Sequence, residues 1–135
     1  MDKQQQPGIT FDAILLSDIH FERKPYLDKN LEIDVSFEAK RSIEGNKGSV
    51  QIITKLQLKT ETEVFVKLEL VHVGFFSVTD EPNMSLEHFL EFNAPALIFP
   101  YIRNEISSIT CSAGLTPVVL PPMNIMAMIK QNEEK

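Results

Sequence analysis

Residues 31–38 read LEIDVSFE, a strict alternation of apolar and polar side chains. A period of two is typical of a β-strand with one buried face. Similar segments occur at 11–22 before it and at 50–59 and 64–78 after it. The sequence GNKG at 45–48 predicts a tight turn, since glycine readily adopts a positive φ. We therefore expect four strands, with the second and third joined by this turn.

The first and fourth strands depart from simple alternation. In the first, the odd positions are mostly apolar, but Ile14 and Leu16 interrupt the pattern. In the fourth, the apolar positions change from even to odd at Leu70 and Val71. Such a change of parity is typical of a β-bulge, because one extra residue moves the following side chains to the other face. We therefore expect a bulge near Leu70 and Val71.

The spacing of apolar residues becomes helical beyond residue 78. A short helix is expected at 85–93, a long one near 98–113 that ends at Gly114, and a Met-rich one at 124–131. Pro100 has to lie in the first turn of the long helix or kink it, because proline lacks a backbone N–H. Strands followed by helices predict an α+β domain with a meandering antiparallel sheet.

The composition places the chain among ordinary globular proteins. With 135 residues it fits one domain over 1–135, with flexible ends at 1–9 and 131–135. A net charge of −6 disfavours nucleic acid and favours a basic protein partner. Cys111 is the single cysteine, which excludes an internal disulfide and fits a reducing compartment. With no targeting or membrane segment visible, we expect a cytoplasmic protein.

The expected strands are long compared with the helices that must cover them. A strand of about 12 residues measures about 40 Å, whereas a helix of about 16 residues measures only about 24 Å. Apolar surface of the sheet is therefore left over. Self-association and a standing binding groove are both compatible with such a surface.

Sites of catalysis, metal binding and nucleotide binding are not indicated. His20, His72 and His88 are scattered, and Cys111 reads as a small buried hydrophobic residue within a helix. Neither Gly-rich phosphate-binding motif occurs. We expect no enzyme activity, no metal and no cofactor.

Four stretches, taken together and in this order, resemble the SecB protein-export chaperones. They are 18–22 (DIHFE), 74–78 (GFFSV), 99–108 (FPYIRNEISS) and 120–125 (LPPMNI). The resemblance implies an ATP-independent holdase that binds unfolded polypeptides and hands them to SecA. It also implies a four-stranded sheet with a crossover loop, a long and a short helix, and a homotetramer built as a dimer of dimers. The interface would lie on the long helix, at Tyr101, Ile102, Ile106 and Ile109.

The resemblance also implies an acidic outer sheet face for SecA. Asp18, Glu22 and Glu69 match the family's acidic positions, while Lys67 replaces an apolar contact residue. If the first two strands pair, six carboxylates form one acidic patch that would attract a basic partner. The alternative is a solvated face that only keeps the protein soluble. The carboxylates in question are Asp12, Asp18, Glu22, Glu32, Asp34 and Glu38.

The client groove implied by the resemblance lies between the sheet, the crossover loop, the helix-connecting loop and the last helix. Methionines suit such a groove, because their thioethers repack around many shapes. The alternative is that these side chains only cap the core. The crossover loop at 23–30 and the last helix are both short, so a dedicated chaperone of an antitoxin and a structural or adaptor oligomer also stay open. The groove residues are Tyr26, Leu27, Leu115, Val118, Val119, Leu120, Met123, Ile125, Met126 and Ile129.

Overall fold

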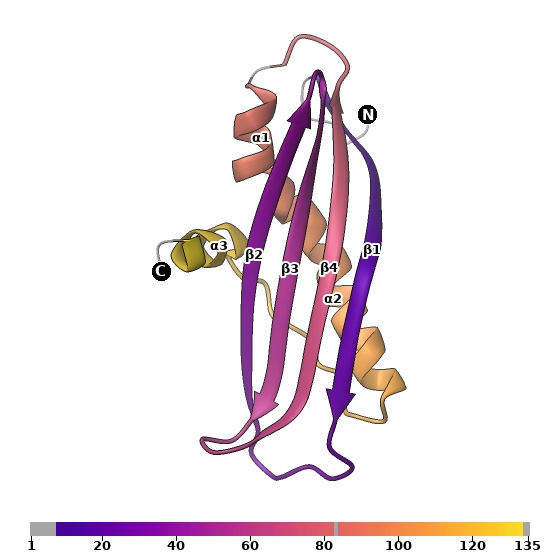
Figure 1. The fold of residues 1–135 in the computed structure, drawn as a ribbon, viewed down its shortest axis with the longest axis vertical. Coiled ribbons are helices and arrows are strands. Elements are labelled where there is room, and N and C mark those ends of the chain that lie inside the picture. The colour runs from indigo at the N-terminus through magenta and orange to yellow at the C-terminus, as the bar shows by residue number, and fades with distance from the viewer. Residues whose placement is uncertain (1–7, 83, 134–135) are drawn as a thin grey trace.

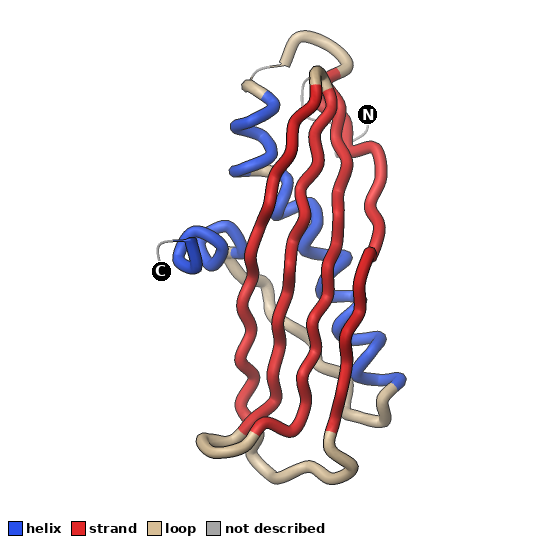
Figure 2. Tube along the Cα trace, viewed as in Figure 1, coloured by secondary structure: helices blue, strands red, loops and turns tan. Residues whose placement is uncertain are grey.

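A computed structural model describes residues 8–82 and 84–133 of the chain. Its four strands form one antiparallel sheet in the order β1-β4-β3-β2, and its helices lie on one face of that sheet (Figure 1; Figure 2). The elements are β1 (Ile9–Arg23), β2 (Glu32–Glu44), β3 (Lys47–Lys59), β4 (Val64–Val78), α1 (Leu86–Phe92), α2 (Ala94–Ser112) and α3 (Ile125–Glu133). The expected α+β fold is confirmed.

Strands β2, β3 and β4 form a meander, whereas β1 returns through the crossover loop to pair with β4. Gly45 has φ +63° and, with Asn46, forms the two-residue turn between β2 and β3. At the next turn, the Thr60 N–H donates to the Glu63 carbonyl at 2.8 Å. Strands β1 and β2 are therefore the opposite edges of the sheet, as Figure 1 shows.

Bulges occur in β1 and not at the expected place in β4. Between Phe11 and Ala13, and again between Leu16 and Asp18, β1 carries one residue more than β4. The bulge expected near Leu70 and Val71 does occur in the β1–β4 pairing, between His72 and Val71, but its extra residue is Ser17 of β1. The β3–β4 register is regular at that place, so β4 itself carries no extra residue there. From Val66 to Val78 the even positions of β4 face the helices, so the odd positions that read as a change of face, Val71, Val73 and Phe75, are apolar residues on the outer face.

The bulges also reverse the expected facing of part of β1. Ile14 and Leu16 lie opposite Gly74 and His72 and pack against the core. Leu15, expected inside, points to the outer face and is 45% exposed. A one-residue insertion has this effect because side chains alternate along a strand.

The core lies between the sheet and the helices. Phe37, Ile52 and Phe76 from the sheet, and Ile98 and Ile102 from α2, are fully buried there. Burial of each such side chain contributes about 1.5–3 kcal/mol. Pro100 lies inside α2, and Pro95 occupies its first turn. The long helix crosses the sheet obliquely, from behind β2 to behind β1 (Figure 1).

Helix α3 begins as expected and packs on β2. The Asn124 side-chain oxygen accepts a hydrogen bond from the Ala127 N–H at 3.1 Å. The Asn132 side chain donates to the Phe37 carbonyl at 3.3 Å. At the other end of the described chain, Ile9 already belongs to β1 and is fully buried. Of the ends expected to be flexible, residues 1–7 and 134–135 lie outside the described residues.

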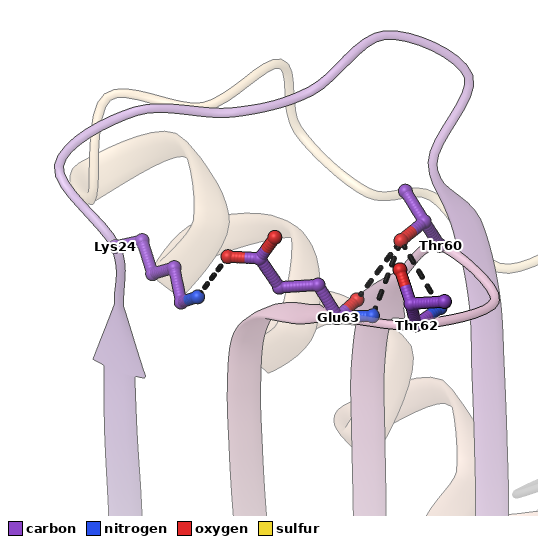
Figure 3. A network of polar contacts seen from close by, with 4 residues as sticks. All are labelled: Lys24, Thr60, Thr62 and Glu63. Atoms are coloured by element: carbon purple, nitrogen blue, oxygen red, sulfur yellow. Dashed lines mark hydrogen bonds and ion pairs between the residues drawn. The ribbon is translucent and has the colours of Figure 1, made fainter.

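The crossover loop is tied to the rest of the sheet at its first residues. The Lys24 ammonium pairs with the Glu63 carboxylate beside the Thr60 turn (Figure 3). The Lys24 backbone N–H donates to the Phe65 carbonyl at 2.9 Å, and the Tyr26 ring packs edge-on against Phe65.

Among residues 8–82 and 84–133, no helix has the length and apolar character needed to span a bilayer.

Candidate functional site

The acidic residues expected on the sheet lie close together on its outer face, which the described helices leave open. Asp18 is paired with Val71, His20 with Glu69 and Glu22 with Lys67. Asp18, His20 and Glu69 line one shallow hollow. We call Asp18, Glu22 and Glu69 the acidic cluster. The pairing of β1 with β4 thus brings together residues that are about 50 positions apart in sequence.

Lysines lie beside the acidic cluster on the same face. Lys67 is directly opposite Glu22, and Lys55 is directly opposite Glu69. These side chains are exposed, so salt screens their interactions strongly. The cluster is a modest source of negative potential at the β1 edge.

The six-carboxylate patch does not form, because β1 and β2 are not neighbours. Strands β4 and β3 lie between them and carry Lys67, Lys55, Gln57 and Gln51 on the outer face. The carboxylates therefore form two separate groups. Asp12, Asp18 and Glu22 lie at one edge, and Glu32, Asp34 and Glu38 lie at the other.

The residues expected in the client groove fall into three classes of exposure. Tyr26, Leu27 and Val119 are exposed, and Val119 most of all at 67%. Met123 and Met126 are half-buried. The other five side chains belong to the protomer's own core and are at most 8% exposed: Leu115, Val118, Leu120, Ile125 and Ile129.

Two hollows lie around the half-buried methionines. The first, of about 210 Å³, includes Phe99, Arg103, Met123 and Met126. The second, of about 370 Å³, lies between α1, α3 and β2 and is lined by the residues Arg41, Glu91, Phe92, Asn124, Met126, Ala127, Ile129, Lys130 and Glu133. Met126 lines both, so the two hollows adjoin.

Sequence reasoning missed Phe92 and Arg41 as lining residues. Phe92 is the last residue of α1 and is 45% exposed, although it is a large aromatic side chain. Arg41 pairs with Glu133 of α3 at 3.4 Å. An aromatic residue at a helix end gives no sequence signal that separates a core role from a binding role.

Hydrogen bonds from α2 hold the helix-connecting loop in place. The buried Thr110 hydroxyl accepts from the Val118 N–H at 2.9 Å and donates to the Ile106 carbonyl at 2.8 Å. The Arg103 Nε donates to the Leu120 carbonyl at 3.0 Å. Val118 and Leu120 are therefore pulled inward, and Val119 between them points to solvent.

The residues expected at an oligomer interface do not share one surface. Ile102 and Ile106 are fully buried beneath α2 in the protomer's own core, and Ile109 is half-buried. Tyr101 is exposed and touches Phe11 of β1 edge-on. Cys111, expected to be buried, is instead exposed, because it faces away from the sheet on α2.

One histidine lies under the helices. His72 is 3% exposed, and its Nδ1 has no hydrogen-bond partner among the described residues. Burial lowers the pKa of His72 below its ordinary value of 6.5. Thr54 on β3 is likewise buried, and its hydroxyl is unpartnered among the described residues.

Within 8–82 and 84–133, no three His, Cys, Asp or Glu residues lie close enough together to hold a metal ion.

Comparison with known proteins agrees with this geometry. A family model described as preprotein translocase subunit SecB matches residues 2–135. The protein-export protein SecB of Nitrosospira multiformis is 26% identical over 99% of this chain and 88% of its own length. An uncharacterised protein of Methanocaldococcus jannaschii is 29% identical over 99% of this chain and 90% of its own length.

A solved structure shares the fold. The Mycobacterium tuberculosis SecB-like chaperone Rv1957, in complex with a peptide from the antitoxin HigA1, superposes with a TM-score of 0.75. It is 17% identical, and the match covers 86% of this chain and 91% of that one. The family match over almost the whole chain, together with this fold, shows that the chain belongs to the SecB family, a family of chaperones and not of enzymes.

Proposed function

We propose that the protein is an ATP-independent holdase, which binds unfolded polypeptides in the cytoplasm and delivers them to SecA. It works as a homotetramer built as a dimer of dimers. The observation that carries the proposal is the pair of adjoining hollows around Met126, in a chain of the SecB family. Exposed and half-buried apolar side chains there offer contacts to extended apolar segments.

The composition of the hollows suits binding of many different sequences. Methionine is flexible and polarizable, so Met123 and Met126 adapt to apolar side chains of different shape. Phe92 adds a rigid aromatic surface, which contributes strongly to binding. Arg41, Glu91 and Lys130 provide charges of both signs at the rim of the larger hollow. The site thus accepts apolar segments with little demand on their charge.

The exposed residues Tyr26, Leu27 and Val119 extend the proposed groove. Leu115, Val118 and Leu120 are buried in the core and reach a client only if the loop at 115–124 moves. Ile125 and Ile129 are also buried, but they lie on α3 and form part of the walls of the two hollows. We therefore assign contact with a client to the exposed and half-buried residues, and capping of the core to the buried ones. Phe92 joins the contact residues.

Holdase activity can be tested with reduced, alkylated α-lactalbumin as a client that cannot refold. We expect it to co-elute with the protein at a mass of about four chains plus client, without ATP, in size exclusion with light scattering. Phe92→Ser combined with Met126→Ser should weaken the complex about ten-fold, because the binding surface loses an aromatic and a thioether contact. Phe75→Ser is the matched control, since Phe75 is exposed on the opposite face of the sheet. Equal loss in both variants, or no complex at all, would contradict the proposal.

Delivery to SecA is tested separately at the acidic cluster. Asp18→Lys and Glu22→Lys should weaken SecA binding about ten-fold at low salt, since they reverse charges that would attract a basic surface. Glu32→Lys at the other edge of the same face is the control and should leave SecA binding unchanged. Equal effects from all three variants would show that net charge, and not the cluster, is responsible.

A dedicated chaperone of an antitoxin is the second candidate. The SecB-like chaperone that shares this fold holds a peptide of an antitoxin. The short crossover loop and short α3 limit the groove, which suits a narrow range of clients. A panel of unrelated unfolded proteins separates the candidates, because a dedicated chaperone ignores the panel. A structural oligomer without clients would form the tetramer and bind neither the panel nor an antitoxin peptide.

A further inference from the structure

A guanidinium lies in the larger of the two hollows around Met126. Arg41 is paired with Val50 of β3, which is fully buried on the face of the sheet that the helices cover. Side chains alternate along a strand, so Arg41 points to that face, whereas Lys40 before it points to the outer face with its partner Gln51. Helix α3 lies beside this edge strand (Figure 1). Arg41 is therefore placed at the sheet edge and directed to the client groove.

Four charged side chains line this hollow, and they balance one another. The cations are Arg41 and Lys130, and the carboxylates are Glu91 and Glu133. The net charge of the lining is zero, so it selects neither acidic nor basic segments. Selection depends instead on how each of these charges is paired within the protomer.

Arg41 is only partly paired. A guanidinium carries five N–H donors in a planar fork, which suits the two oxygens of a carboxylate. Among the described residues, the Arg41 side chain donates only to Glu133 Oε2, which lies 3.4 Å from Nη2. Strong guanidinium–carboxylate hydrogen bonds are shorter, at about 2.7–2.9 Å. The Arg41 side chain is 27% exposed and thus partly withdrawn from water. It therefore keeps donors that a better-placed carboxylate satisfies.

Glu133 shows which chemical group fits Arg41, and it is replaceable. It is the last residue of α3, a helix of nine residues with two buried side chains. The Glu133 side chain is 47% exposed, and ion pairs of such exposed groups contribute little to stability. Asn132 holds the same end of α3 independently, through its hydrogen bond to the Phe37 carbonyl. A carboxylate from a client therefore displaces Glu133 at small cost.

We propose that Arg41 determines specificity in the client groove by binding an Asp or Glu side chain of the client. An apolar anchor of the client lies on Phe92 and Met126, and the nearby carboxylate replaces Glu133 on the guanidinium. Glu133 is thus an internal competitor that occupies Arg41 when no such client is bound. The inference deepens the proposed function and rests on it, because it names a class of segments that the groove prefers. At the other positions of the groove the demand on charge stays low.

A side chain, and not the end of a chain, is the source of this carboxylate. The two hollows adjoin at Met126, so a bound segment continues from one into the other. An unfolded polypeptide has one C-terminal carboxylate but many Asp and Glu side chains. In an extended segment, residues i and i+2 point to the same side about 7 Å apart. A Phe followed two positions later by a Glu therefore presents an aromatic anchor and a carboxylate together.

Capped peptides provide the test. The probe is a fluorescein-labelled extended peptide of about ten residues with Phe-Ser-Glu at its centre and an amidated C-terminus. Matched peptides carry Gln or Lys in place of the Glu, and a fourth ends one residue after the Phe with a free carboxylate. Binding to the full chain is measured by fluorescence anisotropy at about 0.15 M NaCl. The Glu peptide should bind about five-fold more tightly than the Gln peptide, because charge-assisted hydrogen bonds are stronger than neutral ones.

Two variants that break the same ion pair should change this preference in opposite directions. Arg41→Met keeps an apolar stem but removes the guanidinium, so the Glu and Gln peptides should bind equally. Glu133→Gln removes the internal competitor, so the Glu peptide should bind about two-fold more tightly while the Gln peptide is unchanged. A purely structural role of the ion pair would instead shift both variants in the same direction.

Matched controls leave the hollow intact. Lys40→Met removes the neighbouring cation of β2 on the outer face, and Glu87→Gln removes a carboxylate at the start of α1. Both should leave the affinity for every peptide unchanged. Arg41→Lys keeps the charge but not the planar fork, so it should retain only part of the preference. Holding of alkylated α-lactalbumin is measured for every variant.

Three results would overturn the inference. The first is equal affinity for the Glu and Gln peptides in the unchanged protein, including no measurable binding of either. The second is a preference that persists in Arg41→Met, which would assign it to Lys130. The third is tighter binding of the peptide with the free chain end, which would make a C-terminal carboxylate the ligand. The proposed holdase function is judged separately, since it fails if the unchanged protein does not hold α-lactalbumin, whatever the peptides show.

Discussion

Arg23 Nη1 donates a hydrogen bond to the Ala113 carbonyl at 2.9 Å, which joins residues 90 positions apart. The Nε of the same guanidinium donates to the Lys24 carbonyl at 2.9 Å. One side chain thereby connects the end of β1, the start of the crossover loop and the end of α2. A cation at the C-terminus of a helix also interacts favourably with the helix dipole. Both loops of the proposed groove begin at this contact.

Replacement of Arg23 by Met should destabilise the protein by about 1–3 kcal/mol, because hydrogen bonds from a charged donor are lost while the apolar stem is kept. The urea midpoint measures this loss, and amide hydrogen exchange should rise at Gly114 and Leu115. Lys29→Met in the same crossover loop is the control, expected within about 0.5 kcal/mol of the unchanged protein. An equal shift in both variants would show that the Arg23 contact contributes no special stability.

Thr110→Val should cost about 1–3 kcal/mol, because the Val118 N–H is left buried without its acceptor. Thr110→Ser keeps the hydroxyl and loses one methyl group, which costs about 1 kcal/mol. Urea unfolding compares the two. A cost for Thr110→Val no larger than the cost for Thr110→Ser would contradict the role of the hydroxyl in holding the helix-connecting loop.

His72 should make the protein less stable as the pH falls below about 6.5. Burial lowers its pKa in the folded protein, so between the folded and unfolded pKa values the unfolded chain binds more protons. The free energy of unfolding therefore decreases as pH falls through this window and is fully restored above it. His72→Leu should flatten the profile below about pH 6.5.

Thermal unfolding at fixed protein concentration checks this pH dependence, since oligomer stability varies with concentration. His20→Gln is the control, because His20 is exposed on the outer face. A profile that keeps its slope in His72→Leu would assign the acid sensitivity to other groups.

Deletion of Ser17 should be tolerated, whereas deletion of Leu16 should not. Ser17 is the extra residue of the second bulge, so its removal leaves Leu16 opposite His72 and Asp18 opposite Val71. Removal of Leu16 instead places Ser17 in the core opposite His72, at a cost of about 2–4 kcal/mol. Urea midpoints distinguish the two deletions, and similar losses in both would contradict the assigned bulge. The Ser17 deletion removes one of the two bulges of β1, so this edge becomes more regular and self-association, measured by light scattering, should rise.

Local patterns were sufficient to predict most elements of the fold. Alternation at 31–38 and the glycines of the turn act within a few residues, and they predicted the β2–β3 hairpin. Ser85 accepts a hydrogen bond from the His88 N–H and begins α1 as expected. The bulges were missed because Ile14, Leu15 and Leu16 are all apolar. Hydrophobicity alone does not reveal which of three consecutive apolar residues faces out.

The site was less predictable, since its parts come from separate elements. Asp18 and Glu22 share a strand, but their proximity to Glu69 depends on the register of β1 against β4, which involves no local signal. In the helix-connecting loop, Val118, Val119 and Leu120 are chemically alike. Long-range contacts, including the hydrogen bonds of Thr110 and Arg103 to this loop, place Val118 and Leu120 in the core and leave Val119 exposed.

The strand order has a consequence for how the chain folds. Strand β1 is synthesised first, yet its partner β4 is the last strand to emerge from the ribosome. The meander of β2, β3 and β4 is closed by local turns and forms early, whereas pairing of Ile9 with Val78 requires closure of a long loop. Until then β1 exposes its apolar side chains on an unpaired strand, the kind of species that aggregates. During its own synthesis, a protein of this chaperone family therefore passes through a state that resembles the chains it would protect.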